Sequence, residues 1–523
     1  MKTRSPDRRP ALVALLLGVI AGWAMLWLLG GAFVLTNEMG GYGWPGYVLN
    51  GWLAQGDLLT RIDTLRTPLH PLLLGNLGEH LGSYADAGIL ISSLSCALAV
   101  LCAGLGAAAL SGGWAGGLAA LATGMVLGIY GAPSVTNQYP LLAGLTVSAV
   151  GLSAVASRLP GLATGLLAGG ALGLCMAAES RGVLLVPAAV ALVGIGMVRS
   201  HRWGRLRLGV GFALALSAGL WMRATNSEAQ HARMVGDARG LARQAVMMDQ
   251  QRAVIRRWVQ QEMDIHARCV ALSTDDLLTT DYLTTDCAAA VLTNNLTVRI
   301  PRHLPLGAVL TVSGLLLLLL PTRDRRGAWA EGVGAGLLAG SSVLMLAVVT
   351  PMPPRYVIQQ APLLVLIGAA GAGRLAGRLP APLPGLAMAA LTGWVLSGGW
   401  DGRARADRPA LDTAYDTYAE VHRVVGPMLG EHDRLIDCAD LNLELALLPR
   451  RVRSGDLTRD VPLEACAAWI ERPEETPGET YILVRPGRRL RGETDVSEAV
   501  AADGGWEEAA AGVDWALWRS VSR

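Results

Sequence analysis

Residues 11–34 read ALVALLLGVIAGWAMLWLLGGAFV and contain no charged side chain. A helix needs about 20 mainly apolar residues to cross the hydrocarbon core of a bilayer, so this stretch can span one. The basic segment MKTRSPDRRP before it is also typical of a secretory signal peptide. However, the apolar core of a signal peptide is only about 7–15 residues long, and no A-x-A-like cleavage site follows here. We therefore predict a first membrane-spanning helix that begins at Ala11.

The same pattern recurs through the first 400 residues, where basic or polar loops separate ten further apolar stretches. These lie near residues 86–111, 114–132, 139–157, 161–178, 183–198, 208–223, 304–320, 328–349, 361–373 and 382–400. Of the 523 residues, 52% are hydrophobic and only 16% are charged, whereas about a quarter are charged in soluble domains. The sequence thus predicts an α-helical polytopic membrane protein with about eleven transmembrane helices.

The arginines between these stretches predict an orientation. They fall in loops on the same side as the N-terminus: Arg158; Arg199, Arg202, Arg205 and Arg207; Arg323, Arg325 and Arg326; Arg374 and Arg378. Positively charged loops stay in the cytoplasm, so the N-terminus is predicted to be cytoplasmic and residues 401–523 to be extracytoplasmic after eleven crossings. Residues 1–400 then form the transmembrane domain, with large outer loops at about 35–85 and 224–303.

Composition also limits the classes of function. Arginines confined to short loops are not the footprint of a nucleic-acid-binding surface. The segment from residue 401 onward has 24 acidic and 16 basic residues, a net charge of −8, while the membrane part is basic. The richness in Ala, Gly and Arg is typical of a GC-rich, bacterial genome, which predicts the bacterial cytoplasmic membrane as the location.

The seven cysteines divide into two groups. Cys96, Cys102 and Cys175 fall inside apolar stretches, where a thiol usually packs as a small hydrophobic group. The other four fall in predicted outer segments, in the order Cys269, Cys287, Cys438 and Cys466. An even number on the oxidising side predicts two disulfides, Cys269–Cys287 and Cys438–Cys466. Four free thiols are the alternative.

The predicted outer segments have structure of their own. Ile255, Trp258, Val259 and Met263 repeat at helical spacing, which predicts an amphipathic helix that lies on the membrane or packs on its neighbours. In the tail, residues 415–429 have a helical pattern and the segments from 434 and 480 have strand-like patterns. This alternation predicts a small α/β domain, whose acidic residues form either a solvated face or a surface for a partner.

Four segments carry a resemblance to a known family. They read TNEMGGYGWPGYVLNGWLAQGD (36–57) with LRTPLHPLLLGNL (65–77), SGGWAGG (111–117) with GAPSVTNQYPLLAGL (131–145), AAESRGVLLVP (177–187), and MPPRYVIQQAPLLVLIGA (352–369). In this order they resemble the GT-C superfamily of polyprenyl-phosphate-sugar-dependent glycosyltransferases, which includes protein O-mannosyltransferases and the lipid A aminoarabinose transferase. The resemblance covers residues 11–400.

The resemblance implies an inverting transfer of a sugar from a polyprenyl-phosphate donor to a glycan, lipid or protein acceptor. Such a reaction needs a carboxylate to take the proton of the acceptor hydroxyl. The family's base is an acid early in the first outer loop, often followed by a tyrosine, which points to Glu38 and Tyr42. Alignment on Tyr47 instead would put Gly43 at the acid position. Asp57 and Asp63 are then the alternative bases.

The resemblance also suggests groups that bind the donor. An arginine can hold a phosphate with two parallel hydrogen bonds, and Arg355 with Tyr356 follows the prolines of the late family segment. Glu179 and Arg181 would line the sugar pocket, or would pair only with each other. His70 would contact the substrate or serve the fold. We see no clustered metal ligands in the first loop, so no cofactor and no divalent metal are expected.

Two other classes of protein remain as alternatives. A GT-C-like chain that lacks a catalytic base would be a scaffold or a binding protein, with its tail recruiting partners. A transporter usually has internal repeats and helices broken at mid-membrane, and the sequence has no repeat between its halves. The large predicted outer segments also favour an enzyme or a binding protein over a transporter.

Overall fold

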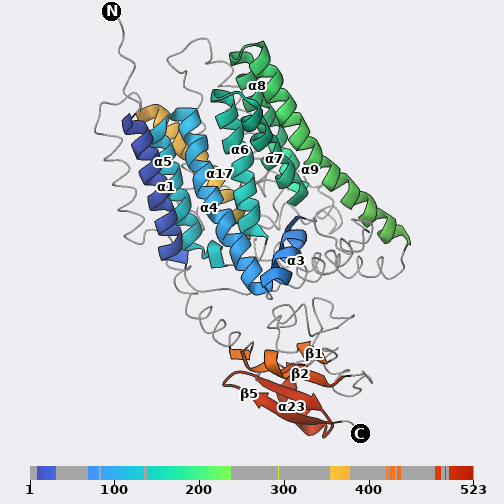
Figure 1. The fold of residues 1–523 in the computed structure, drawn as a ribbon. Coiled ribbons are helices and arrows are strands. Elements are labelled where there is room, and N and C mark those ends of the chain that lie inside the picture. The colour runs from blue at the N-terminus through green and yellow to red at the C-terminus, as the bar shows by residue number, and fades with distance from the viewer. Residues whose placement is uncertain are drawn as a thin grey trace, which may run out of the picture.

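The structure is a computed structural model of the whole chain. It describes residues 9–30, 69–81, 84–134, 138–178, 180–236, 293, 354–376, 420–421, 423–429, 433–437, 478–484, 489–490 and 494–521. Most of the described residues between 9 and 376 form a bundle of long apolar helices, and those after 419 form a small sheet with helices (Figure 1). Glu38, Tyr42 and Asp57, the predicted amphipathic helix at 255–263 and the four cysteines proposed to form disulfides lie outside the described residues.

The long helices of the bundle are α1 (Arg9–Gly30), α4 (Tyr84–Ser111), α5 (Gly113–Ile129), α6 (Tyr139–Arg158), α7 (Leu162–Ala178), α8 (Val186–Arg199), α9 (Arg202–Gly236) and α17 (Pro354–Ala376). The shorter α3 spans Leu69–Leu81, and two 3₁₀ turns, η1 (Ala132–Ser134) and η2 (Ser180–Leu185), connect neighbouring helices. Four helical segments of the described part are long and apolar enough to cross a bilayer: Ala11–Leu29, Asp86–Ser111, Tyr139–Arg158 and Gly182–Arg199.

Together with two shorter apolar helices, α5 and α7, these segments make the chain a multi-pass membrane protein. Their bounds agree with the predicted stretches to within a few residues at most ends. Two predicted helices are longer than expected, because α9 extends the predicted 208–223 to Arg202–Gly236 and α17 extends 361–373 to Pro354–Ala376. The predicted helices at 304–320, 328–349 and 382–400 lie outside the described residues, so the number eleven stays a prediction.

Glycines at close helix contacts fix the relative directions of the helices. The contacts pair Ala11 with Gly113 and Met25 with Gly128 for α1 and α5; Ser95 with Gly144 and Cys102 with Gly151 for α4 and α6; Leu366 with Gly106 and Ser111 with Gly373 for α17 and α4; and Leu208 with Gly165 and Gly219 with Gly173 for α9 and α7. In each pair the residue numbers rise together, so the two helices are parallel. Therefore α4, α6 and α17 all begin at the same end of the bundle.

The predicted SGGWAGG turn joins α4 to α5 at the opposite end. Gly112 has a φ of 103°, which a residue with a side chain rarely adopts, so glycine lets the chain reverse within one residue. Arg158, Arg199 and Arg374 end their helices at this same end, and Arg202 begins α9 there. We call it the arginine end. The other end, where α17 and α6 begin, is called the α3 end because α3 lies there (Figure 1).

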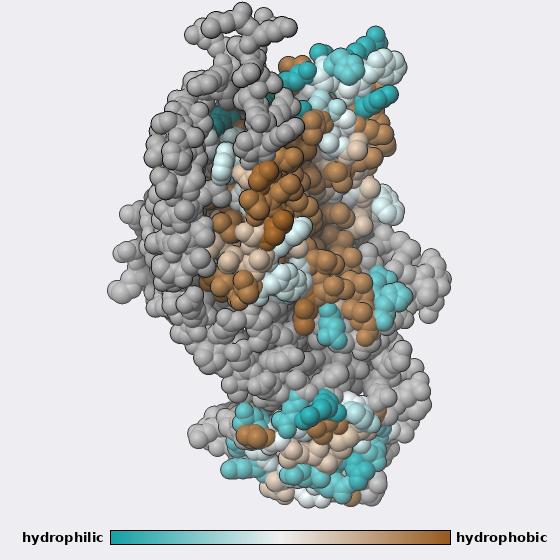
Figure 2. All heavy atoms as spheres, turned by 60° about the vertical axis from the view of Figure 1, so that its left-hand side comes forward, coloured by the Kyte–Doolittle hydropathy of each residue, from teal (hydrophilic) through white to brown (hydrophobic). Residues whose placement is uncertain are grey.

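The outside of the bundle is apolar. Leu16, Leu94, Leu167 and Leu214 are 53–63% exposed, and Figure 2 shows a broad hydrophobic surface on one face of the bundle. A surface of this kind is stable only in lipid. On α9, Trp203 and Trp221 are 65% and 62% exposed, and they are 18 positions apart, which is about 27 Å along the helix and close to the thickness of a hydrocarbon core. Since tryptophans gather at membrane interfaces, the pair marks the two bilayer surfaces.

Buried cysteines and hydroxyls fill the interior of the bundle. Cys96, Cys102 and Cys175 are buried free thiols, which confirms their prediction as packing residues. The hydroxyl of Thr146 on α6 lies 3.7 Å from the sulfur of Cys175 on α7. In the lipid-facing layer, the indole N–H of Trp23 on α1 donates to the carbonyl of Ala97 on α4 at 3.0 Å. Contacts through small residues therefore dominate the packing, as is common between membrane helices.

The C-terminal part contains a four-stranded sheet in the order β1-β2-β6-β5, which lies beyond the α3 end in Figure 1. Its strands are β1 (Arg434–Asp437), β2 (Thr480–Val484), β5 (Trp506–Ala511) and β6 (Ala516–Ser520). β1 and β2 are parallel, and the other pairs are antiparallel. A two-stranded ribbon, β3 (Arg489–Leu490) with β4 (Thr494–Asp495), precedes α23 (Val496–Ala502). The strands predicted from residues 434 and 480 are present. A separate α/β domain that begins at residue 401 stays a prediction.

Candidate functional site at the α3 end of the bundle

The start of α17 lies at the α3 end and is fixed there by a buried helix. Pro354 begins α17, since the first turn of a helix needs no N–H donor at that position. Every residue from 361 to 370 is buried, and this part of α17 packs against α4, α5 and α6. Arg355 and Tyr356, the predicted phosphate-binding residues, occupy the first turn of α17.

Two buried glutamines follow in the next turn of α17. Gln359 is 1% exposed and Gln360 is fully buried. Within the part of the chain that the structure describes, Oε1 of Gln359 and both amide heteroatoms of Gln360 have no hydrogen-bond partner. Burial of an unpaired amide is unfavourable, so this pair is unusual in a helix interior. The sequence analysis missed it, although two adjacent polar residues inside an apolar stretch were a visible signal.

The turn between α7 and α8 lies at the same end. α7 runs antiparallel to α6, so its last residue, Ala178, lies near the beginning of α6. The 3₁₀ turn η2 then folds back on α7. The approach is close, since a Cβ atom added at Gly182 would lie only 2.9 Å from the carbonyl of Cys175. Arg181 is part of η2, whereas Glu179 lies outside the described residues.

The turn η1 and the helix α3 complete this end of the bundle. The hydroxyl of Ser93 on α4 donates to the carbonyl of Pro133 in η1 at 3.1 Å. α3 packs along α4, with Leu69, His70 and Leu74 buried. The elements α3, η2 and α17, which carry His70, Arg181, Arg355 and Tyr356, therefore lie at the same end of the bundle. The predicted bases, Glu38 and Asp57, belong to residues outside the description.

The described residues contain no group of three or more His, Cys, Asp and Glu side chains that could hold a metal ion. Residues 35–68 of the predicted first outer loop lie outside the described residues, so metal independence stays a prediction. At the α3 end, the described residues include Arg355, Tyr356, Gln359 and Gln360 on α17. The elements α3 and η2, which carry His70 and Arg181, lie at the same end.

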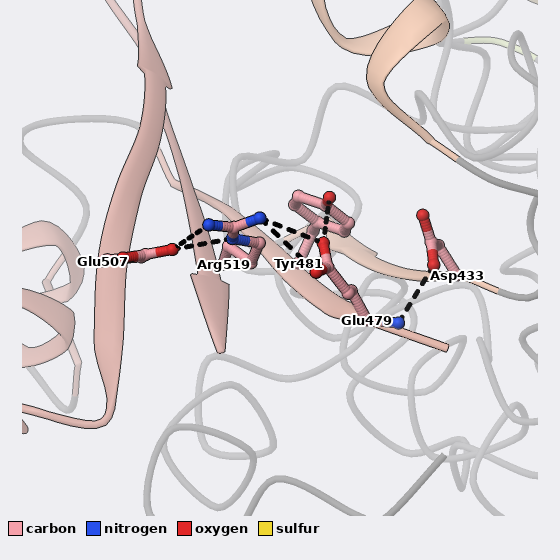
Figure 3. A network of polar contacts seen from close by, with 5 residues as sticks. All are labelled: Asp433, Glu479, Tyr481, Glu507 and Arg519. Carbon is pink, nitrogen blue, oxygen red and sulfur yellow. Dashed lines mark hydrogen bonds and ion pairs between the residues drawn. The ribbon is translucent and has the colours of Figure 1, made fainter. Parts of the chain in front are cut away.

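A second polar cluster lies on the C-terminal sheet (Figure 3). The hydroxyl of Tyr481 on β2 donates to Glu479 at 2.6 Å, and Arg519 on β6 lies between the carboxylates of Glu479 and Glu507, with its Nε donating to Glu507 at 2.7 Å. Burial, with the hydrogen bond to Glu479 second, raises the pKa of Tyr481 to about 12. The main-chain N–H of Glu479 donates to Asp433 at 2.9 Å. These contacts link all four strands of the sheet or the residues just before them, which is a structural role.

Comparison with known proteins gives a fold but no close relative. No known protein-family profile matches the sequence, and no curated protein is similar to it. Among solved structures, the chain is similar to ArnT from Cupriavidus metallidurans bound to undecaprenyl phosphate, with 14% identity, a TM-score of 0.52 and 99% of each chain covered. The apo form of that protein matches with 12% identity, a TM-score of 0.54 and 97% of each chain covered. This chain has the GT-C fold.

The similarity to ArnT covers both the helical bundle and the C-terminal sheet. The match extends over nearly all of both chains, so it includes the helical bundle and the sheet after it. The expectation of a GT-C-like fold, drawn from four short sequence segments, is confirmed. Parts of three of those segments, now seen as α3, η1 with α6 and η2, lie at the same end of the bundle as the start of α17.

Proposed function

We propose that this protein is a membrane glycosyltransferase that transfers a sugar from a polyprenyl-phosphate donor to an acceptor at the extracytoplasmic face. The observation that carries the proposal is the match over 99% of both chains to ArnT, which was solved with undecaprenyl phosphate. The position of α17 adds support, since its first turn brings a cationic residue to the bundle end opposite the arginine-rich loops. By the positive-inside rule, that end faces away from the cytoplasm.

The proposed chemistry needs one base and one group that stabilises the leaving phosphate. The oxygen of the acceptor hydroxyl attacks the anomeric carbon of the sugar, and the bond from that carbon to the phosphate oxygen breaks. The bonding pair leaves with the polyprenyl phosphate, and the hydroxyl proton goes to a carboxylate, for which we propose Glu38. Attack from the side opposite the leaving group inverts the anomeric centre.

Arg355 is proposed to bind the phosphate, on which negative charge develops as the bond breaks. Its guanidinium keeps its charge in the membrane interface and matches a phosphate with two N–H donors. Tyr356 would position the same phosphate, while Arg181 in η2, with Glu179, would shape the sugar pocket. We propose the bacterial cytoplasmic membrane as the location and a divalent metal as unnecessary. The acceptor is a glycan, a lipid or a protein.

The experiment compares two arginines of α17 in the purified full-length protein in nanodiscs. Arg355→Gln is expected to weaken the binding of undecaprenyl phosphate by about 10- to 100-fold, as for the loss of a charge-assisted hydrogen bond. Arg374→Gln, at the opposite end of the same helix, serves as the matched control and is expected to bind normally. Equal binding by both variants would remove Arg355 from the donor site.

Catalysis is tested separately through the proposed base. Glu38→Gln should keep the binding of undecaprenyl phosphate and reduce sugar transfer by about 10²- to 10⁴-fold, the usual contribution of a general base. Unchanged transfer in this variant would move the role to another carboxylate, with Asp57 and Asp63 next to be replaced. If the wild-type protein fails to bind undecaprenyl phosphate, the proposed function is wrong.

A further inference from the structure

The chemistry of the buried pair Gln359 and Gln360 limits which ligand groups could hydrogen-bond to it. Three of its amide heteroatoms have no partner among the described residues: two carbonyl oxygens and one NH₂ group. The oxygens need a hydrogen-bond donor. Neither side chain is charged, so the pair matches an uncharged group that both donates and accepts, as a hydroxyl does. A phosphate dianion has no hydrogen to donate and would leave the oxygens unpaired.

The main chain beside the pair has the same need. Pro362 lies inside α17 and lacks an N–H, so the helical turn that begins at residue 358 lacks its main-chain hydrogen bond. In a membrane helix, a carbonyl released in this way is satisfied by a neighbouring group or by a ligand. The carbonyl of residue 358, which lacks the usual N–H donor four residues later, and two amide oxygens thus fall within three consecutive residues.

Two of the helices that pack on α17, α4 and α6, run parallel to it. Gly106 of α4 lies against both Leu366 of α17 and Gly151 of α6, and the three helices are parallel. By helical spacing, α4 has Ala99 and α6 has Gly144 two turns nearer the α3 end, and neither residue has a polar side-chain atom.

The position of the pair on α17 relates it to the proposed phosphate site. Residues four apart lie on one face of a helix, so Gln359 follows Arg355 and Gln360 follows Tyr356, each about 6 Å deeper along the axis. A ligand whose phosphate is bound at the first turn would carry its next chemical group beside the second turn. The phosphate of a lipid-linked donor is bonded to two such groups, the isoprenoid and the sugar, and only the sugar has hydroxyls that can donate to the amide oxygens.

We propose that Gln359 and Gln360 form a subsite that hydrogen-bonds the hydroxyls of the donor sugar. This inference rests on the proposed function and assigns its sugar-recognition residues. In the absence of donor the amides are unpaired, and binding of the sugar supplies the missing donors. The pair therefore favours a sugar-bearing lipid over the free polyprenyl phosphate that remains after transfer, which promotes release of the product.

The test uses the double substitution Gln359→Leu with Gln360→Leu in the full-length protein in nanodiscs. An apolar side chain of similar size at an unpaired polar position leaves the empty protein as stable or makes it more stable, so Tm should not fall. Undecaprenyl phosphate should bind as to the wild type. Binding of the undecaprenyl-phosphate-linked sugars, tried as glucose, mannose and galactose, should weaken by about tenfold for the sugar that the wild type prefers.

The matched control is Ser111→Ala at the arginine end, because Ser111 also has a buried hydroxyl oxygen without a hydrogen-bond partner. It should leave both affinities unchanged. Should the leucine variant not fold, Gln359→Met with Gln360→Met provides the same test with flexible side chains. A fall in the Tm of the empty methionine variant would overturn the proposal and assign the amides to the fold.

The remaining outcomes also decide. If the variant and the wild type bind all lipids equally, the amides bind an ordered water only. If the wild type binds no lipid-linked sugar more tightly than undecaprenyl phosphate, the sugar subsite is refuted while the proposed phosphate site stands. If undecaprenyl phosphate itself does not bind to the wild type, the proposed function fails and takes the subsite with it.

Discussion

Gly22 of α1 provides a quantitative test of the helix packing. A Cβ atom at this position would lie 2.5 Å from the carbonyl oxygen of Ala120 on α5 and 2.9 Å from Cγ1 of Val100 on α4. Ordinary contacts begin near 3.4 Å, so the substitution Gly22→Ala must separate the helices by several tenths of an ångström. The oxygen belongs to a helix backbone and cannot rotate away.

The expected net effect is a loss of about 2 kcal/mol in the free energy of unfolding. Overpacking of a tight contact costs about 1–3 kcal/mol, and we take the upper value because the clash involves backbone. Alanine in place of glycine returns about 1 kcal/mol through its better helix propensity. The control is Gly170→Ala on α7, where the nearest atom to the new Cβ is Cβ of Ala215 at 3.9 Å. That variant has only the propensity gain, so the two should differ by about 3 kcal/mol.

The assay is reversible unfolding of the purified protein in mixed detergent and SDS micelles, followed by circular dichroism. Gly22→Ala should shift the midpoint to lower SDS and Gly170→Ala to equal or higher SDS. Equal midpoints for the two variants would contradict the close contact of α1 with α4 and α5, and with it the helix directions inferred from such contacts.

Two further predictions concern the C-terminal domain. The pKa of Tyr481 is raised to about 12, so the folded domain holds a proton that the unfolded chain loses near pH 10. This contribution to stability is complete below pH 10 and is lost as the pH rises to 12. The ionisation of Tyr481 is followed by the difference in 295-nm absorbance between the wild type and Tyr481→Phe, which should appear near pH 12. Its appearance near pH 10 would argue against burial of the phenol. Asp495 caps α23 by accepting from the N–H of Ser497 at 2.9 Å, so Asp495→Ala should cost about 1 kcal/mol in urea unfolding of the domain, whereas Asp495→Asn should cost less.

The helices could be predicted from sequence because lipid solvation requires long apolar stretches. The arginine side could also be predicted, since charged residues mark the ends of these stretches. The extension of α9 to Gly236 was not predicted, because the helix becomes polar beyond Trp221. Apolar stretches indicate which residues lie in lipid, and they do not show where a helix continues into water. The strands β1 and β2 were visible as short apolar runs between polar segments.

The candidate site was only partly visible in the sequence. Arg355 and Arg181 were found because a charge between apolar stretches is conspicuous, and the resemblance gave them roles. Gln359 and Gln360 were missed because their burial and their lack of partners depend on how α17 packs on other helices, which one sequence does not specify. Glu38 stays a prediction, since the residues around it lie outside the description.

A structure of the full-length protein in nanodiscs with undecaprenyl phosphate, determined by cryo-electron microscopy, would locate the donor site. We expect the phosphate to lie at the first turn of α17, within hydrogen-bonding distance of Arg355, with the isoprenoid chain along the outside of the bundle. A phosphate at the arginine end, or on the far side of the bundle from the start of α17, would contradict this expectation.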